Sequence, residues 1–377
     1  MFFRTLIFPL LGCTSFHVAA QTQQVLVTFT DTSRADRAIP VDFRYDETTA
    51  PGPLVLVAHG FVMGPADYDD LADALVDEGY VVGLLDTETG FAASHEDYGL
   101  DLVHVIQHAA YEAPGISGWL EGPSGIVGHS MGGGAAWLAG AELGLELGAL
   151  VGLAPAETTP SAMDAGPAIQ APTMVVSGTA DEVTPPELQH TPLYDALTSA
   201  SCRAFVSLEG GGHCGFADAG SLCDFGELLF NGMSREEQQG WSFDAVKAWL
   251  NAHLKDVSEG LAPLEAMDAN ATVVELTLEC ETSAAGERAV PAWTVVPNPA
   301  TSEVRLQPTA GMHVTRDRFM TGSWTAWDAH GRSLPIRWMS PSTLDVSAWP
   351  RGMNVLVHVD ESGAENFRAR VITLAGL

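Results

Sequence analysis

Short apolar runs alternate with longer amphipathic segments between residues 53 and 254. Continuous apolar runs are typical of strands that a sheet buries on both faces. We expect strands over residues 53–58, 80–85, 125–128, 147–153, 173–177 and 203–208. The segments between them have the lengths and end residues of helices. We place helices over residues 67–78, 97–112, 131–143, 186–199 and 234–254. This succession predicts an α/β fold with a doubly wound, mostly parallel sheet.

Segments in which apolar and polar residues alternate flank this region. Residues 24–30 and 41–45 alternate in this way, and we expect them to add an antiparallel edge to the sheet. Residues 272–281 alternate as well and predict a further strand, with Cys280 at its end. That strand either extends the main domain or belongs to a short linker unit, and the sequence leaves both interpretations open.

The last part of the chain, residues 291–377, follows a different pattern. It opens with Trp293-Thr-Val-Val-Pro-Asn-Pro-Ala300 and continues with short alternating segments, which predict a small antiparallel β-sandwich. The succession resembles the C-terminal sorting domain of type IX secretion cargo in Bacteroidota. This resemblance implies export across the outer membrane by the type IX secretion machinery, followed by removal of the domain. A carbohydrate-binding or other β-module is the alternative, with Trp324, Trp327 and Trp338 as its candidate aromatic residues.

The first twenty residues have the features of a secretory signal peptide. Arg4 supplies the positive charge, residues 6–12 an apolar stretch, and residues 18–20 a small-residue cleavage site. Residues 10–13 also approximate a lipobox, which would make Cys13 a lipid anchor. We therefore predict a secreted protein that is either extracellular or held at the cell surface.

Composition and charge exclude several classes of protein. Hydrophobic residues make up 46% of the 377 residues and charged residues 17%, which is a globular composition. The chain has no run of eighteen apolar residues, so we expect no integral membrane span. Its net charge is −31, with Lys247 and Lys255 as its only lysines. Such a chain repels phosphate and is not expected to bind nucleic acid.

The charge is unevenly distributed along the chain. Residues 291–377 hold eight arginines and seven acidic residues, a net charge of +1. Residues 1–290 hold nine basic and 41 acidic residues, a net charge of −32. Two parts with different surfaces are therefore joined, and self-repulsion of the acidic part predicts a monomer.

Four cysteines remain after the predicted signal peptide, and they allow three complete pairings. Cys214 and Cys223 are close in sequence, so a disulfide between them closes a short loop at low entropic cost. Cys202 and Cys280 then pair by elimination. A zinc site is the alternative use of these cysteines, although the chain has no CxxC pair.

The sequence Gly128-His129-Ser130-Met131-Gly132 lies between a predicted strand and a predicted helix. This G-x-S-x-G pattern is typical of a nucleophile elbow, a tight turn that exposes the serine hydroxyl at the edge of the sheet. Glycines flank the serine because a Cβ there would clash. An ordinary serine in a glycine-rich turn is the alternative interpretation.

A serine hydroxyl becomes a nucleophile when a base takes its proton and an acid orients the base. Asp181 follows the predicted strand 173–177, and His213 follows the predicted strand 203–208. Both lie where strands end, in the order that the elbow predicts. Glu182 is the competing acid. The remaining candidates are interpreted as packing or surface histidines, namely His59, His95, His104, His108 and His190.

The oxyanion of an acyl-transfer intermediate needs two backbone donors. The residue after the nucleophile, Met131, is expected to provide one of them. The loop after strand 53–58 is expected to provide the other, and Phe61 is the candidate there. The mechanism that these residues predict needs neither a cofactor nor a metal.

Residues 24–256 resemble α/β-hydrolases of the dienelactone hydrolase, chlorophyllase-like and polyester hydrolase (cutinase-like) group. The matching residues are His59-Gly60-Phe61, the elbow extended to Gly134, Gly178-Thr-Ala-Asp181 and His213. The resemblance implies a serine carboxylic-ester hydrolase with an acyl-enzyme intermediate, acting on short-chain esters or polyesters. The polyester hydrolases of this group carry a tryptophan clamp after the strand that follows the elbow helix, and residues 153–159 contain no aromatic residue. We therefore predict a generic carboxylic ester as substrate.

The sequence thus predicts four parts in the chain: a signal peptide (1–20), an α/β-hydrolase domain (21–256), a linker or hydrolase extension (257–290) and a sorting domain (291–377). Two other functions use the same residues. One is an acyltransferase or peptidase with the same triad, and the other is a non-catalytic surface binding module with the same fold. A fluorophosphonate probe that labels Ser130 would separate the enzymes from the binding module.

Overall fold

The computed structural model describes residues 22–227, 232–255, 257, 260–270, 272–280, 293–296, 302–308, 323–328, 332–340, 343–359 and 365–373. The predicted signal peptide and the candidate lipid anchor Cys13 lie outside these residues. None of the helices in the described ranges combines the length and the apolar character that crossing a membrane requires.

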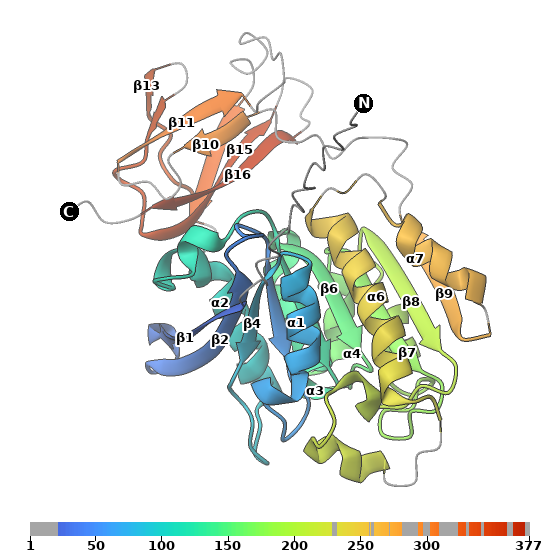
Figure 1. Cartoon of the computed structure of the whole chain (residues 1–377). Helices are drawn as coiled ribbons and strands as arrows, with labels where there is room; N and C mark the ends of the chain where they lie inside the picture. Colours follow the sequence, from blue (N-terminus) through green and yellow to red (C-terminus); the bar gives the residue numbers. More distant parts are fainter. Residues whose placement is uncertain are drawn as a thin grey trace, which may run out of the picture.

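One large sheet dominates the structure (Figure 1). Its strands lie in the order β1-β2-β4-β3-β5-β6-β7-β8-β9. The pairs from β4 through β3 and on to β8 are parallel, whereas β1, β2 and β9 pair antiparallel. The strands are β1 (Thr22–Asp31), β2 (Arg37–Asp46), β3 (Leu54–Ala58), β4 (Val81–Leu85), β5 (Ser124–His129), β6 (Leu147–Leu153), β7 (Thr173–Gly178), β8 (Cys202–Leu208) and β9 (Val274–Cys280). The predicted α/β-hydrolase architecture is confirmed.

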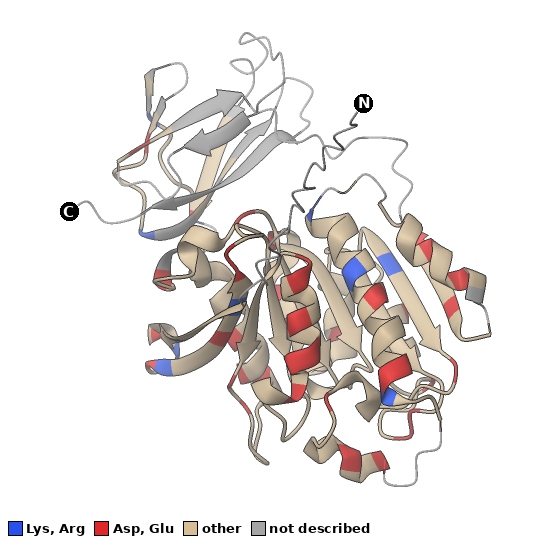
Figure 2. Ribbon diagram, in the orientation of Figure 1, with Lys and Arg blue, Asp and Glu red and all other residues tan. Residues whose placement is uncertain are grey.

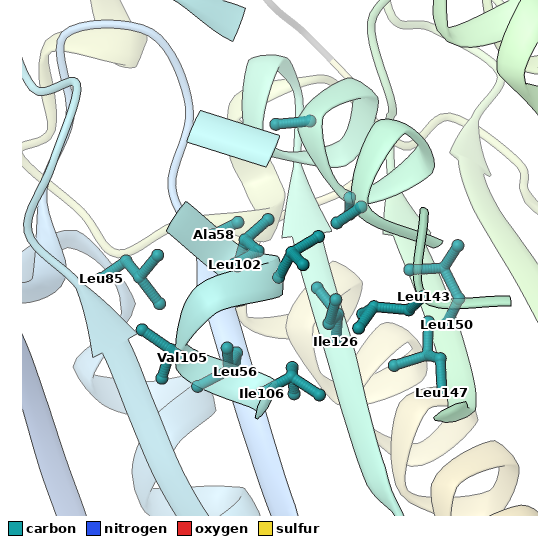
Figure 3. Packing of buried hydrophobic residues seen from close by; sticks show 14 of the residues in the cluster. Leu56, Ala58, Leu85, Leu102, Val105, Ile106, Ile126, Leu143, Leu147 and Leu150 are labelled. Carbon is teal, nitrogen blue, oxygen red and sulfur yellow. The ribbon is translucent and has the colours of Figure 1, made fainter. Parts of the chain in front are cut away.

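Helices cover both faces of this sheet, because its central strands are apolar on both faces. Every residue of β3 to β7 is buried. One face packs against α2 (His95–Glu112) and α3 (Met131–Leu143), where Leu56, Leu102 and Ile126 belong to one apolar cluster (Figure 3). The other face packs against α1 (Asp69–Asp77) and α6 (Arg235–Leu254). The shorter helices are α4 (Ala162–Ala165), α5 (His190–Asp195) and α7 (Ala262–Met267).

One predicted helix is much shorter than expected. The sequence predicts a helix over residues 186–199, but α5 covers only His190–Asp195. Pro185, Pro186 and Pro192 lie in or beside this segment. Proline lacks the backbone N–H and disfavours helical geometry in the residue before it. The chain therefore makes turns before a short helix, and this path brings His190 toward the end of β7.

The two disulfides are those that the sequence favours. Strand β9 pairs antiparallel with β8 and places Cys280 opposite Cys202, and the two form a disulfide. Cys214 and Cys223 form the second disulfide. All four cysteines are therefore used in bonds to sulfur, whereas the zinc alternative would need free thiolates. The position of β9 also shows that residues 274–280 extend the main sheet.

Antiparallel strands occupy the C-terminal part, as the sequence predicts. One sheet has the order β10-β11-β14-β13 and the other β12-β15-β16. Their strands are β10 (Trp293–Val296), β11 (Glu303–Pro308), β12 (Ser323–Asp328), β13 (Trp338–Ser340), β14 (Thr343–Asp345), β15 (Gly352–Val359) and β16 (Glu365–Thr373). Val304 and Leu344 are buried in the first sheet and Ala326 and Leu356 in the second, so each sheet contributes apolar side chains to an interior.

Acidic residues are spread over the main domain and recur along α1 (Figure 2). The few arginines described in the main domain are used in ion pairs. Arg34 and Arg37 both contact the carboxylate of Asp101, at 2.6 and 2.7 Å. These pairs join the β1–β2 hairpin to α2 and compensate the buried charge of Asp101.

Candidate active site

A strained turn joins β5 to α3, and Ser130 occupies it. The backbone of Ser130 has φ 53° and ψ −120°, a region that residues with a Cβ rarely adopt and that often marks functional sites. The turn is tight enough to exclude side chains on both sides. A Cβ at Gly128 would lie 2.3 Å from the carbonyl oxygen of Gly132, and one at Gly132 would lie 2.2 Å from that of Ala58. Glycine is therefore required at both positions.

The structure brings Ser130, Asp181 and His213 together at the carboxyl ends of β5, β7 and β8. The Oγ of Ser130 lies 2.9 Å from Nε2 of His213. The Nδ1 of the same histidine lies 2.8 Å from Oδ2 of Asp181. All three side chains are buried, and Ser130, the most accessible, is 9% exposed. The competing acid, Glu182, is exposed. The predicted triad thus has hydrogen-bonding geometry.

Four donors surround the carboxylate of Asp181. Its Oδ1 accepts from the backbone N–H groups of Val183 and Thr184, at 2.8 and 2.7 Å. Its Oδ2 faces Nδ1 of His213 and the hydroxyl of Thr184, both at 2.8 Å. Burial works to raise the pKa of this carboxyl, but the hydrogen bonds and charge of His213 and Thr184 outweigh it, and the pKa is lowered. Asp181 is therefore ionised at neutral pH.

The loop that carries His213 is fixed at three points. The carboxylate of Glu227 accepts from the backbone N–H groups of His213 and Cys214, at 2.5 and 2.8 Å. The disulfide from Cys214 to Cys223 ties the same loop to a neighbouring turn. The carbonyl of Gly211 accepts from the N–H of Ala180, at 2.9 Å, which joins the loop to that of Asp181. The imidazole consequently sits on a rigid support.

His129 links the elbow to two other loops. The hydroxyl of Tyr68 accepts from the N–H of Gly60 at 2.8 Å and lies 2.7 Å from Nδ1 of His129. The Nε2 of His129 lies 3.1 Å from the carbonyl oxygen of His213. Since that carbonyl can only accept, Nε2 carries the proton and Nδ1 accepts from Tyr68. Burial and the neighbouring His213 lower the pKa of His129 to about 3, so the ring is neutral.

The buried, neutral state of His129 predicts a measurable pH dependence of stability. Its pKa is about 3 when folded against an ordinary value of 6.5, so the unfolded chain binds a proton between these pH values and the folded chain does not. The free energy of unfolding therefore falls as pH falls below 6.5. Below pH 6.5, His129 should lower the free energy of unfolding of the wild-type protein by about 1.4 kcal/mol per pH unit. Urea unfolding between pH 8 and 5 should show that His129→Gln lacks this contribution.

Above pH 7.5 the same two proteins should give parallel curves, because neither state of His129 is protonated there. His104 and His190 also have pKa values lowered to about 4, mainly by burial. Both histidines are present in the wild type and in the variant, so their contributions cancel when the two free energies of unfolding are subtracted. An identical slope for both proteins between pH 6.5 and 5 would show that His129 is not held neutral.

One candidate oxyanion donor, Met131, lies in the elbow itself, and the other, Phe61, lies in the loop after β3. Met131 is the first residue of α3, so its N–H has no acceptor within the helix. The amide of Phe61 donates no hydrogen bond within the described part of the chain. A Cβ at Gly60 would lie 3.3 Å from Nδ1 of His129, which shows how closely this loop approaches the elbow. The ring of Phe61 is 49% exposed and lies edge-on to that of Phe91, 6.1 Å away.

Comparison with known proteins places this site in a family. The model of a PET hydrolase-like family matches residues 41–235, slightly more than half of the chain. The chain belongs to the PET hydrolase-like family. The matched range contains Ser130, Asp181 and His213. A bis(hydroxyethyl) terephthalate hydrolase of Streptomyces coelicolor (strain ATCC BAA-471 / A3(2) / M145) is 28% identical over 172 residues, which cover 45% of this chain and 53% of that protein. The chain thus spans about half the length of the curated relative it matches.

Several residues of this PET hydrolase-like site were not recognised in the sequence. His59 and His190 were predicted to be packing or surface residues, and both are buried; they also make polar contacts that the sequence did not indicate. The ring nitrogens of His59 lie 2.8 Å from the carbonyl oxygens of Gly60 and Thr87. His190 contacts Thr184, and Thr184 contacts Asp181. The spacing of Asp181 and Thr184 is typical of a turn in which an aspartate accepts from nearby amides, and this signal identifies Thr184.

A cluster of three or more His, Cys, Asp or Glu residues suited to a metal ion is absent from the described ranges. The polar groups of the PET hydrolase-like site are instead arranged around one hydroxyl, one imidazole and one carboxylate. Such an arrangement can activate the hydroxyl as a nucleophile toward an electrophilic carbon.

Proposed function

We propose that this protein is a serine carboxylic-ester hydrolase, with Ser130 as nucleophile, His213 as general base and acid, and Asp181 as the orienting acid. The observation that carries this proposal is the continuous pair of contacts from Ser130 Oγ to His213 Nε2 and from His213 Nδ1 to Asp181 Oδ2, at 2.9 and 2.8 Å. The strained elbow that presents Ser130 supports the same assignment.

The chemistry is a two-step acyl transfer. His213 accepts the proton of Ser130 as Oγ attacks the ester carbonyl carbon, and the carbonyl becomes a tetrahedral oxyanion. The imidazolium then gives its proton to the leaving alcohol as the bond from carbon to alkoxy oxygen breaks, which leaves an acyl-enzyme. Water repeats the sequence and releases the carboxylic acid. Asp181 holds the proton on Nδ1 of His213, so that Nε2 is free to accept.

The backbone N–H groups of Phe61 and Met131 stabilise the oxyanion. One donor of this kind contributes about 10²- to 10³-fold to kcat in acyl-transfer enzymes. The network from Gly60 through Tyr68 to His129 ties the loop of Phe61 to the elbow. It therefore holds both candidate donors in one rigid frame before the substrate arrives.

The substrate is a short-chain carboxylic ester or a polyester. The relative from Streptomyces coelicolor is a bis(hydroxyethyl) terephthalate hydrolase by name, which makes that diester a sensible first substrate. Residues 153–159 pass directly behind the elbow, because the N–H of Ala156 donates to the carbonyl of Ser130 at 2.9 Å. This segment offers no aromatic ring, whereas the exposed rings of Phe61 and Phe91 offer apolar surface in the loops after β3 and β4.

The test is active-site labelling combined with turnover. A fluorophosphonate probe should react with one residue, Ser130, identified by mass spectrometry of the labelled peptide, with loss of fluoride. Labelling should abolish hydrolysis of p-nitrophenyl butyrate and of bis(hydroxyethyl) terephthalate. The absence of both labelling and hydrolysis would support a binding module instead. Transfer of the acyl group to an added alcohol, faster than to water, would support an acyltransferase.

We further propose that the protein acts outside the cytoplasm. Two disulfides are typical of proteins that fold in oxidising compartments, and both are present here. The resemblance of residues 291–377 to type IX sorting domains indicates the type IX secretion machinery as the partner in export. Expression with and without residues 291–377 in a host with that machinery, followed by comparison of the culture medium, tests this proposal.

A further inference from the structure

Behind the triad, a second buried polar chain ends on Asp181. The Oγ of Ser177 lies 2.7 Å from Nδ1 of His190. The Nε2 of His190 lies 3.0 Å from the hydroxyl of Thr184, which lies 2.8 Å from Oδ2 of Asp181. His190 is fully buried, and Ser177 and Thr184 are 1% and 5% exposed. The mechanism proposed above uses none of these three side chains.

The direction of these hydrogen bonds follows from proton counting. An ionised carboxylate only accepts, and a hydroxyl has a single proton to donate. The Thr184 proton therefore points to Asp181, at 2.8 Å, and not to the carbonyl oxygen of Ala154, at 3.4 Å. The Thr184 oxygen accepts from Nε2–H of His190. The lone pair of this ring then lies on Nδ1, which accepts from Ser177. Burial lowers the pKa of His190 to about 4, so a neutral ring with one proton is the form present at neutral pH.

The opposite orientation is unfavourable. If Thr184 donated to His190, its oxygen lone pairs would face the Asp181 carboxylate at 2.8 Å without a proton between them. In either orientation the Thr184 oxygen lies 2.8 Å from Nδ1 of His213, and in the favoured one the N–H of His190 occupies one of its lone pairs. Donation toward the carboxylate leaves Oδ2 with two hydrogen bonds and a fixed position.

We propose that Thr184 is a positioning residue of the triad, whose hydroxyl, oriented by His190, fixes Oδ2 of Asp181 where it orients the imidazole of His213. The inference rests on the proposed function. We expect Thr184 and His190 to affect the rate of the chemical step and not substrate binding, because neither side chain contacts Ser130.

The experiment compares Thr184→Val, which removes the hydroxyl, with Thr184→Ser, which keeps it. Loss of one hydrogen bond to a charged group should lower kcat for p-nitrophenyl butyrate about tenfold and leave KM within about twofold. The serine variant should recover most of this loss. The downfield proton resonance of Nδ1 of His213, which reports its bond to Asp181, should shift in the valine variant and return in the serine variant. A purely structural role would not produce this pattern.

A second pair of variants tests His190 and covers the case in which Thr184→Val fails to fold. His190→Gln can place an amide N–H near the position of Nε2, whereas His190→Asn is too short to reach Thr184. The asparagine variant should match Thr184→Val in kcat, and the glutamine variant should be closer to wild type. Activity is normalised to the fraction of sites that a fluorophosphonate probe labels.

Two results overturn the inference and leave the proposed function intact. One is a valine variant with wild-type kcat and an unshifted Nδ1 resonance. The other is a serine variant as slow as the valine variant, because the hydroxyl would then not restore the rate on its own. Failure of the wild-type protein to hydrolyse any ester would instead contradict the proposed function itself.

Discussion

Replacement of Ser130 by alanine is expected to abolish ester hydrolysis while the protein stays folded. Alanine keeps the Cβ, so the strained backbone of the elbow, with φ 53°, is neither relieved nor worsened. The change removes the attacking oxygen and its contact with Nε2 of His213. The loss in kcat should be about 10⁵- to 10⁶-fold, with residual rate from the oxyanion donors alone. Initial rates with p-nitrophenyl butyrate measure it, and thermal unfolding verifies the fold.

Ser124→Ala is the matched control for this prediction. Ser124 begins β5 and Ser130 follows its end, so the two serines lie at opposite ends of one buried strand. The control should keep wild-type turnover and remain labelled by a fluorophosphonate. If Ser130→Ala kept more than about one hundredth of the activity, a different nucleophile would have to be sought.

The strand segments of the main sheet and the three triad positions could be predicted because each depends on a short stretch of sequence. Buried strands are continuous apolar runs, and the elbow requires glycine at positions 128 and 132 for steric reasons. Asp181 and His213 each follow such a strand directly. The carboxyl ends of parallel strands lie at the same edge of a sheet. Residues that directly follow such strands are therefore expected to lie close together.

The support around the triad could not be predicted in the same way. His190 reaches Thr184 because three prolines shorten the expected helix and redirect the chain. Glu227 reaches the amide of His213 across a loop that a disulfide closes. These contacts depend on the exact path of loops, which no periodic pattern encodes. The Cys202–Cys280 disulfide was predicted only by elimination. The sequence left open whether residues 272–281 extend the main domain, so it did not predict the antiparallel pairing of β9 with β8.

Replacement of Asp181 by asparagine is expected to lower kcat about 10³- to 10⁴-fold through the tautomer of His213. In the wild-type protein, Oδ1 of Asp181 accepts hydrogen bonds from the backbone N–H groups of Val183 and Thr184. In the variant, the amide oxygen of the asparagine must take this place, because only an oxygen can accept them. The amide nitrogen then occupies the position of Oδ2 and donates to Nδ1 of His213. The imidazole proton is forced onto Nε2, which can no longer accept the proton of Ser130. Stopped assays between pH 6 and 9 should show the loss throughout this range.

Glu182→Gln is the companion variant, because Glu182 is the neighbouring carboxylate and the competing acid in the sequence. Glu182 is exposed and Asp181 is 3% exposed, so only the latter holds its charge where water does not screen it. The glutamine variant should therefore keep kcat within about twofold of wild type. A large loss in Glu182→Gln together with a small one in Asp181→Asn would reverse the assignment of the acid. Comparable losses in both would mean that the acidic loop acts through its total charge and that the tautomer argument is wrong.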